Sequence, residues 1–247
     1  MLPTLVINLA RSKERWTKLA ESGRGTGLEV RRVPAIDGAA VPEGLRGDLD
    51  AAKFRLNHGR QVLAGEYGCY QSHLSALQTI VDEGYELAII AEDDIRLNGD
   101  LEKRVEAIFR ASPSIDLLKL VNHRTTGFIR HGISALGDEF GRCIHGPQGS
   151  AACYAVTQQG ARRLLVALKP MWLPYDLALE RGWSTGVSTF TTRVPFVAFE
   201  EANRADTTIA TRTQYREAKL SKFKRWNVLK FRSRDYVSRI AYGLKRP

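Results

Sequence analysis

The chain has 247 residues and carries a formal net charge of +10 at pH 7. Hydrophobic residues make up 43% of the sequence, which excludes a chain that is disordered throughout. No apolar run approaches the roughly 18 residues that a membrane-spanning helix requires. The first eight residues lack the basic region and the long apolar core of a secretory signal. The three cysteines, at positions 69, 143 and 153, fit neither a disulfide framework nor a zinc motif, so we expect a reducing cytosol.

The positive charge is concentrated at the carboxyl end of the chain. Residues 216–247 contain eleven lysines and arginines against Glu217 and Asp235, which gives this segment a net charge of +9. The preceding 215 residues therefore carry only +1. A nearly neutral body followed by a strongly basic tail indicates that the tail has an anionic surface as its partner.

Strand-like and helix-like patterns alternate through the first half of the chain. An aliphatic run at 4–8 precedes a helix that Ser12 can cap and that extends to residue 20. Further strands are expected at 29–33, 87–91 and 117–121, and further helices at 65–80 and 101–109. This alternation predicts βαβ units, and therefore an α/β fold with a mostly parallel sheet flanked by helices.

The second half of the chain is less regular. A strand is expected at 151–156 and a helix at 158–168. Prolines at 170 and 174 then interrupt the pattern, and Asp176 opens a short helix. Residues 187–199 contain two further β-rich runs. The simplest organisation is one α/β domain over 1–212, followed by a basic tail over 213–247.

The junction between the aliphatic strand at 87–91 and Glu92-Asp93-Asp94 is the most informative motif. In open α/β sheets, ligands bind at the carboxyl ends of the strands. Three adjacent carboxylates repel one another, so they are stable only in water or beside a cation. A divalent metal held by these oxygen ligands could bridge to the phosphates of a nucleotide. The alternative is a solvated acidic turn, because the nearby Asn98-Gly99 pair is also typical of loops.

Six short segments follow one another along the chain, and their order is informative when they are considered together. They are 6–15 (VINLARSKER), 34–38 (PAIDG), 65–73 (GEYGCYQSH), 90–95 (IAEDDI), 155–165 (AVTQQGARRLL) and 174–176 (PYD). Each motif alone is weak, but their order and spacing are specific. Over residues 4–210 the chain resembles glycosyltransferase family 25, which includes lipopolysaccharide and lipooligosaccharide galactosyltransferases of bacteria and the collagen galactosyltransferases.

The resemblance implies a GT-A-like, Rossmann-related fold and a nucleotide-sugar donor, typically UDP-galactose. It also implies transfer with inversion at the anomeric carbon, onto a glycan acceptor of the lipopolysaccharide or lipooligosaccharide type. Such transfer requires stabilisation of the departing diphosphate, and a fixed cation near the β-phosphate provides it. Glu92-Asp93-Asp94 resembles the Asp-X-Asp motif of GT-A enzymes, and Mn²⁺ or Mg²⁺ suits its oxygen ligands.

Roles for the three acidic residues follow from this resemblance. Asp94 is expected to bind the metal, and Glu92 to bind the metal or the ribose. Asp93 is expected to contact the nucleotide sugar from the other side of the chain, because side chains alternate along a strand.

Polar residues after the first strands are expected to complete the donor site. Asn8 and Arg11 follow the strand at 4–8, and Arg11 could hold the diphosphate through two parallel hydrogen bonds. Arg15 is expected on a solvated helix face. Asp37 is expected to contact the uracil or the ribose, or alternatively only to form an Asp-Gly turn with Gly38.

Inversion in one displacement requires a general base beside the acceptor hydroxyl. The resemblance favours Asp176 for this role, and the structural alternative is that Asp176 only caps the short helix that it opens. Glu66 and His73 are the other candidates on the acceptor side, since they are seven residues apart and share a helix face. Otherwise His73 is a partly buried histidine that bonds a backbone carbonyl.

The tail contains one apolar helical stripe, formed by Tyr236, Val237, Ile240, Ala241 and Leu244. A basic amphipathic helix of this kind can lie in a membrane interface, so we expect a cytoplasmic enzyme held on the inner membrane beside a lipid-linked acceptor. Alternatively the stripe packs on the domain and the charges face solvent.

Two other classes of function remain open. The aromatic residues among the basic ones in residues 216–247 also fit a non-enzymatic protein that binds nucleic acid or another anionic surface. The near-neutral body argues against nucleic acid. A catalytically silent relative that binds a nucleotide sugar is the third possibility.

Overall fold

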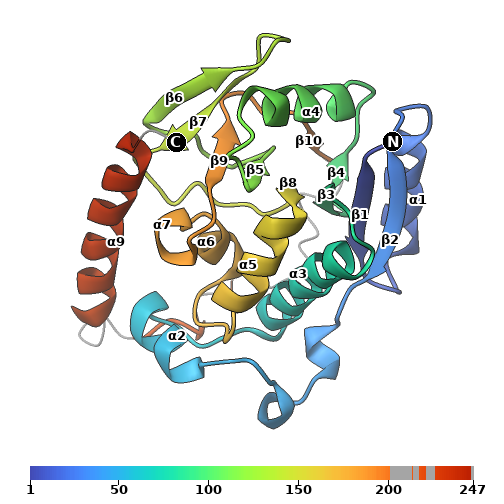
Figure 1. Ribbon diagram of the computed structural model, residues 1–247. Coiled ribbons are helices and arrows are strands. Elements are labelled where there is room, and N and C mark those ends of the chain that lie inside the picture. The colour runs from blue at the N-terminus through green and yellow to red at the C-terminus, as the bar shows by residue number, and fades with distance from the viewer. Residues whose placement is uncertain (201–212, 214–216, 221–225, 246–247) are drawn as a thin grey trace.

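The computed structural model describes residues 1–200, 213, 217–220 and 226–245 (Figure 1). The sequence-based boundary between a domain at 1–212 and a tail at 213–247 falls beside residues 201–212 and 214–216, which lie outside this description.

An eight-stranded sheet forms the centre of the fold (Figure 1). Its order is β2 (Glu29–Pro34), β1 (Pro3–Asn8), β3 (Leu87–Glu92), β8 (Cys153–Thr157), β5 (Leu117–Lys119), β9 (Thr189–Thr192), β7 (Glu139–Cys143) and β6 (Phe128–Ile133). The pairings orient six of these strands in one direction and leave β8 and β7 reversed. The expected α/β fold with a mostly parallel sheet is therefore confirmed. A short antiparallel ladder joins β4 (Ile95–Arg96) to β10 (Ala198–Phe199).

Helices cover both faces of this sheet. They are α1 (Lys13–Gly23), α2 (Ala51–His58), α3 (Ala64–Asp82), α4 (Leu101–Ala111), α5 (Gln158–Ala167), α6 (Tyr175–Leu179), α7 (Gly182–Thr185) and α9 (Trp226–Leu244), with 3-10 turns η1 (Gly38–Ala40) and η2 (Glu43–Leu45). Helices α3, α5 and α6 pack into one apolar cluster, and α1 and α4 into a second. Strand β3 belongs to both, with Ala88 and Ile90 in the first cluster and Ile89 and Ala91 in the second. Burial on both faces explains why this strand is a continuous aliphatic run.

Helix α2 was not predicted from the sequence. It buries only Phe54, so its apolar pattern is too weak to identify a helix. Its ends nevertheless carry local signals, because the Asp50 carboxylate accepts a hydrogen bond from the Lys53 amide (2.8 Å) and Gly59 closes the helix at φ 80°.

The hairpin of β6 and β7 was also not predicted. Glycines interrupt both of its strands, and a Cβ at Gly132 would lie 2.3 Å from the Phe140 ring. Because Gly132 has no side chain, the alternation of apolar and polar residues that would indicate a strand is interrupted at the position where the Phe140 ring packs.

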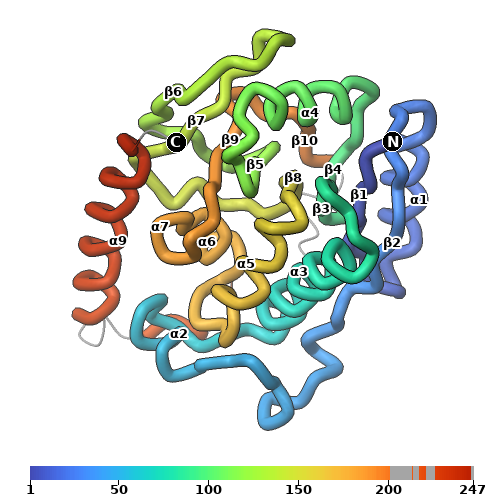
Figure 2. Tube along the Cα trace, viewed as in Figure 1, coloured from blue at the N-terminus to red at the C-terminus, as the bar shows by residue number. Residues whose placement is uncertain are grey.

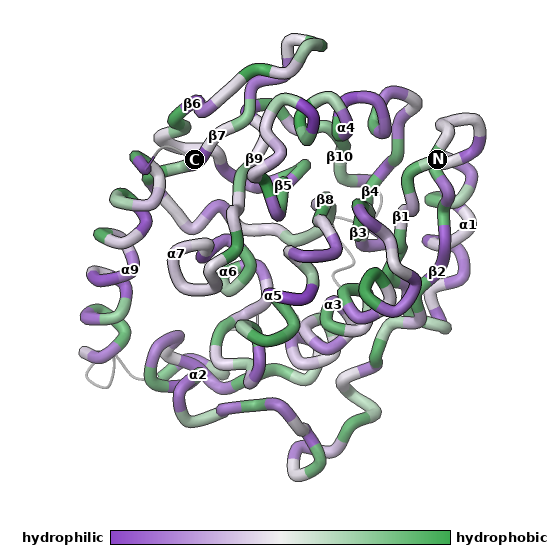
Figure 3. Tube along the Cα trace, viewed as in Figure 1, coloured by the Kyte–Doolittle hydropathy of each residue, from purple (hydrophilic) through white to green (hydrophobic). Residues whose placement is uncertain are grey.

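Helix α9 lies at the edge of the molecule opposite β1 and β2 (Figure 2). Hydrophobic and hydrophilic residues alternate along it (Figure 3). The helix expected in the tail is present, and its apolar stripe is divided between two environments. Val237 is 67% and Leu244 59% exposed, whereas Ile240 is half-buried and Tyr236 stacks on His145 of the domain at 5.9 Å. The buried side chains are instead those of Val228 and Arg239. In the described part of the chain, no helix combines the length and the apolarity needed to cross a membrane.

Polar contacts dock α9 on the domain. Arg142 of β7 donates hydrogen bonds to the carbonyls of Tyr242 (3.1 Å) and Lys245 (2.9 Å) at the end of the helix. The Tyr242 hydroxyl accepts a hydrogen bond from the Thr189 amide of β9 (2.8 Å). The last carbonyls of the helix thus find donors in the sheet, which removes the cost of leaving them unpaired.

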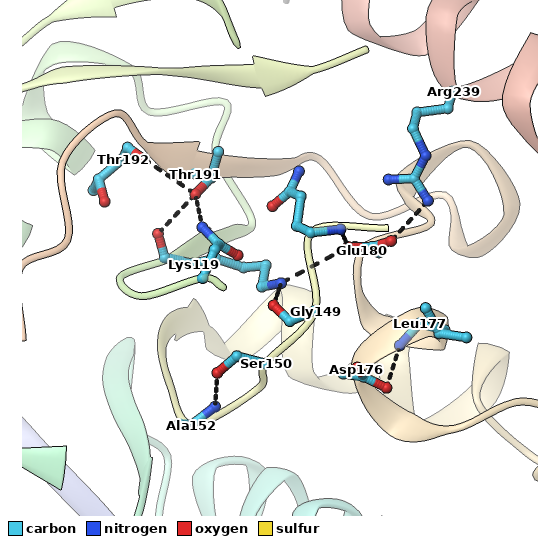
Figure 4. Close-up of polar contacts among 12 residues, drawn as sticks. Lys119, Gly149, Ser150, Ala152, Asp176, Leu177, Glu180, Thr191, Thr192 and Arg239 are labelled. Carbon is cyan, nitrogen blue, oxygen red and sulfur yellow. Dashed lines mark hydrogen bonds and ion pairs between the residues drawn. The ribbon is translucent and has the colours of Figure 1, made fainter. Parts of the chain in front are cut away.

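A buried charge network continues from α9 into the core (Figure 4). Arg239 is 4% exposed and its Nη2 lies 2.7 Å from Glu180 Oε1. The other oxygen of Glu180 accepts a hydrogen bond from the Gln148 amide (2.9 Å) and lies 3.9 Å from Lys119 Nζ. A Cβ at Gly146 would lie 2.6 Å from Arg239 Cζ, so the chain needs a glycine where the guanidinium enters.

Removing this guanidinium tests the docking of the tail. Arg239→Met leaves Glu180 buried with only the more distant Lys119 as its counter-charge, so we expect the free energy of unfolding to fall by about 3 kcal/mol. Urea denaturation measures this change. Arg234→Met, on the exposed side of the same helix, is the matched control and is expected to change stability by less than about 0.5 kcal/mol. Equal stabilities of the two variants would contradict a structural role for the pair.

Candidate active site

The carboxyl ends of β1 and β3 bring Asn8 and the acidic triplet together. Because these strands are parallel neighbours, their ends meet at one edge of the sheet. Asn8 Nδ2 donates a hydrogen bond to Asp93 Oδ2 (2.6 Å), and Arg15 Nη1 lies 3.4 Å from Asp93 Oδ1. The expectation of a solvated Arg15 is wrong, since its side chain is 12% exposed and reaches across from α1 to Asp93. Asp93 is therefore held by an amide and a guanidinium.

Glu92 is held from the opposite side by α3. His73 Nε2 lies 3.2 Å from Glu92 Oε1, and His73 Nδ1 lies 3.1 Å from the Tyr154 hydroxyl. The imidazole stacks on the Tyr175 ring at 4.1 Å, and the two tyrosine hydroxyls are 2.8 Å apart. His73 thus bonds side chains, where the sequence suggested a backbone carbonyl as the alternative to a catalytic role. Its contacts fix the orientation of Glu92.

Asp94 differs from the other two members of the triplet. Its Oδ1 is buried and has no hydrogen-bond partner within the described residues. Burial is the largest cause, and together with the neighbouring charges of Glu92 and Asp93 it raises the pKa of Asp94 to about 7. A buried carboxylate in this condition is unfavourable unless a cation pairs with it.

Two sets of side chains could offer ligands to a metal here. Cys69, His73 and Glu92 present sulfur, nitrogen and oxygen atoms within 4.8 Å of one another, a set that suits zinc. However, burial raises the pKa of the Cys69 thiol well above its usual value, and both nitrogens of His73 already have partners. Glu92 and Asp94 offer carboxylate oxygens, the type of ligand that suits Mg²⁺ or Mn²⁺. The Asp94 oxygen without a partner among the described residues agrees with such a site, whereas Asp94 lines neither of the two cavities that border Glu92.

A first cavity, of about 80 Å³, opens between the end of β1, the segment 35–38 and the start of α3. It is lined by Arg11, Asp37, Cys69, His73, Glu92 and Asp93, among others. Arg11 pairs with Asp37, and Asp37 also accepts a hydrogen bond from the Ala39 amide (3.1 Å). Asp37 therefore forms the turn and faces the cavity, so the two interpretations of this residue are compatible.

Two glycines allow the segment 35–38 to approach α3 closely. A Cβ at Gly38 would lie 1.8 Å from the Ala64 carbonyl oxygen, and a Cβ at Gly68 would lie 2.4 Å from the Ile36 oxygen. These positions belong to the PAIDG and GEYGCYQSH motifs, so both motifs are explained in part by backbone packing.

A second cavity, of about 320 Å³, also borders Glu92. It shares Cys69 and Glu92 with the first cavity, and it also contains Asp176, Glu66 and His123. Burial raises the pKa of Asp176, whereas the charge of the buried Lys119 opposes that shift. Asp176 does not cap α6, because Pro174 occupies the cap position, and its Oδ1 accepts a hydrogen bond from the Leu177 amide (2.9 Å; Figure 4).

Glu66 is more firmly engaged than Asp176. Both of its carboxylate oxygens pair with the guanidinium of Arg60, and one also accepts a hydrogen bond from the Leu63 amide (3.2 Å). Of the three residues considered as a base, Glu66 and His73 are bound to other side chains. In the described structure, Asp176 is the one whose carboxylate bonds only backbone.

Several residues of this site were not identified from the sequence. Arg60, His123 and Glu180 carry no motif, and His123 is placed by stacking on Phe199 at 5.3 Å. Lys119 did carry a signal, because it is the single charge in the aliphatic run Leu117-Leu118-Lys119-Leu120-Val121. Its Nζ donates a hydrogen bond to the Gly149 carbonyl (3.0 Å), and burial lowers its pKa (Figure 4).

Comparisons with known proteins agree with these motifs. A rat protein named probable inactive glycosyltransferase 25 family member 3 is 28% identical over 181 residues, which cover 69% of this chain and 31% of that protein. Human procollagen galactosyltransferase 2 is 29% identical over 107 residues, 40% of this chain and 17% of that protein. The chain therefore spans less than a third of the length of these relatives.

A solved structure of the galactosyltransferase LgtC with donor and acceptor sugar analogs covers 100% of this chain and 98% of its own, at 13% identity and a TM-score of 0.42. The profile of glycosyltransferase family 25 (LPS biosynthesis protein) matches residues 1–179. Because this match extends over more than half of the sequence, the chain belongs to glycosyltransferase family 25.

Proposed function

We propose that this chain is an inverting, metal-dependent glycosyltransferase that uses UDP-galactose and a glycan acceptor of the lipopolysaccharide or lipooligosaccharide type. The observation that carries the proposal is the meeting of two cavities at Glu92. One contains the Arg11–Asp37 pair, and the other contains Asp176. A donor on one side and an acceptor on the other would place the reacting carbon between them.

The donor side needs positive charge where the diphosphate departs. Asp94 and Glu92 would hold a divalent cation, which when bound supplies that charge. The carboxylate of Asp93 is bound by Asn8 and Arg15, so Asp93 would hold the end of β3 in place beside the cation. Arg11 is 57% exposed, so its guanidinium can exchange Asp37 for a phosphate at little cost in burial.

The acceptor side needs a base that can receive a proton. Asp176 has a free face in the second cavity, and its raised pKa brings it closer to the neutral range in which a general base is efficient. The charge of Lys119 opposes the rise in the pKa of Asp176 and thereby favours its ionised form. In a single displacement, Asp176 takes the hydroxyl proton as the acceptor oxygen attacks the anomeric carbon opposite the diphosphate.

The metal requirement is tested with the isosteric variant Asp94→Asn. The rate of UDP-galactose hydrolysis in the presence of Mn²⁺ is measured as the release of UDP. We expect this rate to fall at least about 100-fold, because the cation loses a charged ligand at the leaving group. Chelation by EDTA should have the same effect on the unaltered protein. Asp100→Asn, at an exposed position, is the matched control. Hydrolysis that resists both EDTA and Asp94→Asn would remove the metal from the proposal.

The role of Asp176 is tested with Asp176→Asn. Turnover is expected to fall about 10²- to 10⁴-fold, while the Kd for UDP-galactose stays unchanged, because a base acts on the acceptor and not on donor binding. Activity of the unaltered protein should be lost as the pH falls through the raised pKa of Asp176, since the base must be ionised. Full turnover by Asp176→Asn would assign the base elsewhere.

The outward side of α9 supports attachment to an anionic membrane. Trp226, Leu229, Val237 and Leu244 are exposed there, and Lys230 and Arg234 are exposed beside them. Apolar side chains can enter the headgroup region while each basic residue contributes about 1 kcal/mol near an anionic leaflet.

Charge reversal on this side tests the attachment. The double variant Lys230→Glu/Arg234→Glu is expected to bind vesicles containing phosphatidylserine at least about tenfold more weakly, as measured by co-sedimentation. Arg110→Glu, an exposed change on α4, serves as the control. Equal sedimentation of the double variant and the unaltered protein would exclude α9 as the membrane-binding surface.

A further inference from the structure

A third cavity lies between the inner side of α9 and the domain. Its volume is about 440 Å³, within the range of about 300–1,000 Å³ that is usual for small-molecule sites. Helix α9 contributes one wall, and α2, α6 and the segment 146–147 contribute the others. The cavity adjoins the one that contains Asp176, because His58 and Leu177 line both.

The lining of this cavity is amphipathic. Pro147, Leu173 and Leu177 supply apolar surface, and Phe231 and Tyr236 supply ring faces and edges. Polar groups lie among them on α2 and α9. Sugars present an apolar face and a rim of hydroxyls, so a cavity with aromatic, aliphatic and polar walls suits a hexose.

Two of the three arginines in the lining are already neutralised. Arg181 Nε lies 2.7 Å from Asp235 Oδ1, and Arg239 is shared between Glu180 (2.7 Å) and Asp235 (3.6 Å). These pairs hold the wall of α9 in place. Arg239 therefore stabilises the cavity and does not offer its charge to a ligand.

Arg232 is the third arginine and differs from the other two. It is exposed, and it has no ion-pair or hydrogen-bond partner among residues 1–200, 213, 217–220 and 226–245. Burial and the charges of Arg60 and Arg232 lower the pKa of the neighbouring His58 to about 3, so His58 adds no charge of its own. Within the described part of the cavity wall, Arg232 is thus a cation that is available to an anionic ligand.

We propose that this cavity is an acceptor subsite, in which Arg232 binds the phosphate or carboxylate of an acidic sugar while the adjoining residue of the acceptor extends toward Asp176. This inference rests on the proposed function, and it assigns the basic tail a part in choosing the acceptor. A glycan that crosses from α9 to the second cavity would pass His58 and Leu177, which line both.

Equilibrium dialysis of the full chain tests the subsite. The probes are labelled glucose 6-phosphate, glucuronate, methyl glucoside and inorganic phosphate, each measured with saturating UDP so that the donor side is blocked. We expect at least one acidic sugar to bind more tightly than methyl glucoside and inorganic phosphate. Arg232→Gln should weaken that binding about tenfold, as expected for the loss of a charge-assisted hydrogen bond. Arg55→Gln, an exposed arginine of α2 outside the lining, is the matched control.

The outcomes separate the subsite from the catalytic proposal. Binding of inorganic phosphate as tight as that of the acidic sugars would remove the sugar from the inference. If methyl glucoside binds as tightly as the acidic sugars, or if Arg232→Gln has no effect, Arg232 has no role in ligand binding. Absence of binding by all four probes would overturn the subsite altogether. The Kd for UDP, measured on the same samples, reports on the donor side. Failure of UDP to bind while an acidic sugar still does would instead count against the proposed function.

Discussion

The constraint on which the site depends is the repulsion among three carboxylates at the end of a buried strand. Each carboxylate has a different environment. Glu92 meets an imidazole from α3, and Asp93 meets an amide from β1 and a guanidinium from α1. Among the described residues, Asp94 Oδ1 is buried without a hydrogen-bond partner. The scaffold thus provides side-chain partners for two of the three carboxylates, and the proposed function assigns a cation to the third.

A second buried charge organises the other half of the molecule. Glu180 follows α6 directly, and its carboxylate pairs with Lys119 of the sheet and Arg239 of the tail. Asp176 lies one helical turn before Glu180, so the network that docks the tail also sets the charge around the candidate base. Basic residues of the tail therefore contribute to the core, although their number alone suggests a purely solvated appendage. The inner side of α9 combines these polar contacts with Val228 and Phe231, whereas Val237 and Leu244 are exposed on the outer side.

The success of the sequence-based interpretation varied with the range of the interactions. Buried strands such as β3 were predicted because burial on both faces leaves an unbroken aliphatic run. Helix α3 was predicted because its apolar residues recur at helical spacing. Helix α2 buries one side chain, and the strands of the β6–β7 hairpin contain glycines, so neither had a pattern to detect. In the tail, periodicity predicted the helix. It did not decide whether the apolar stripe faces a membrane or packs on the domain.

The sequence by itself determined the α/β class, the family and the position of the acidic junction, because these depend on local order and spacing. Only the tertiary structure decided which carboxylate is partnered, because Asn8, Arg15 and His73 approach the junction from distant parts of the chain. It also decided that Arg239 is buried while Val237 is exposed. The physical reason is the same in both cases: a charge is stable in the interior only beside a partner, and partners are brought together by folding and not by neighbourhood in sequence.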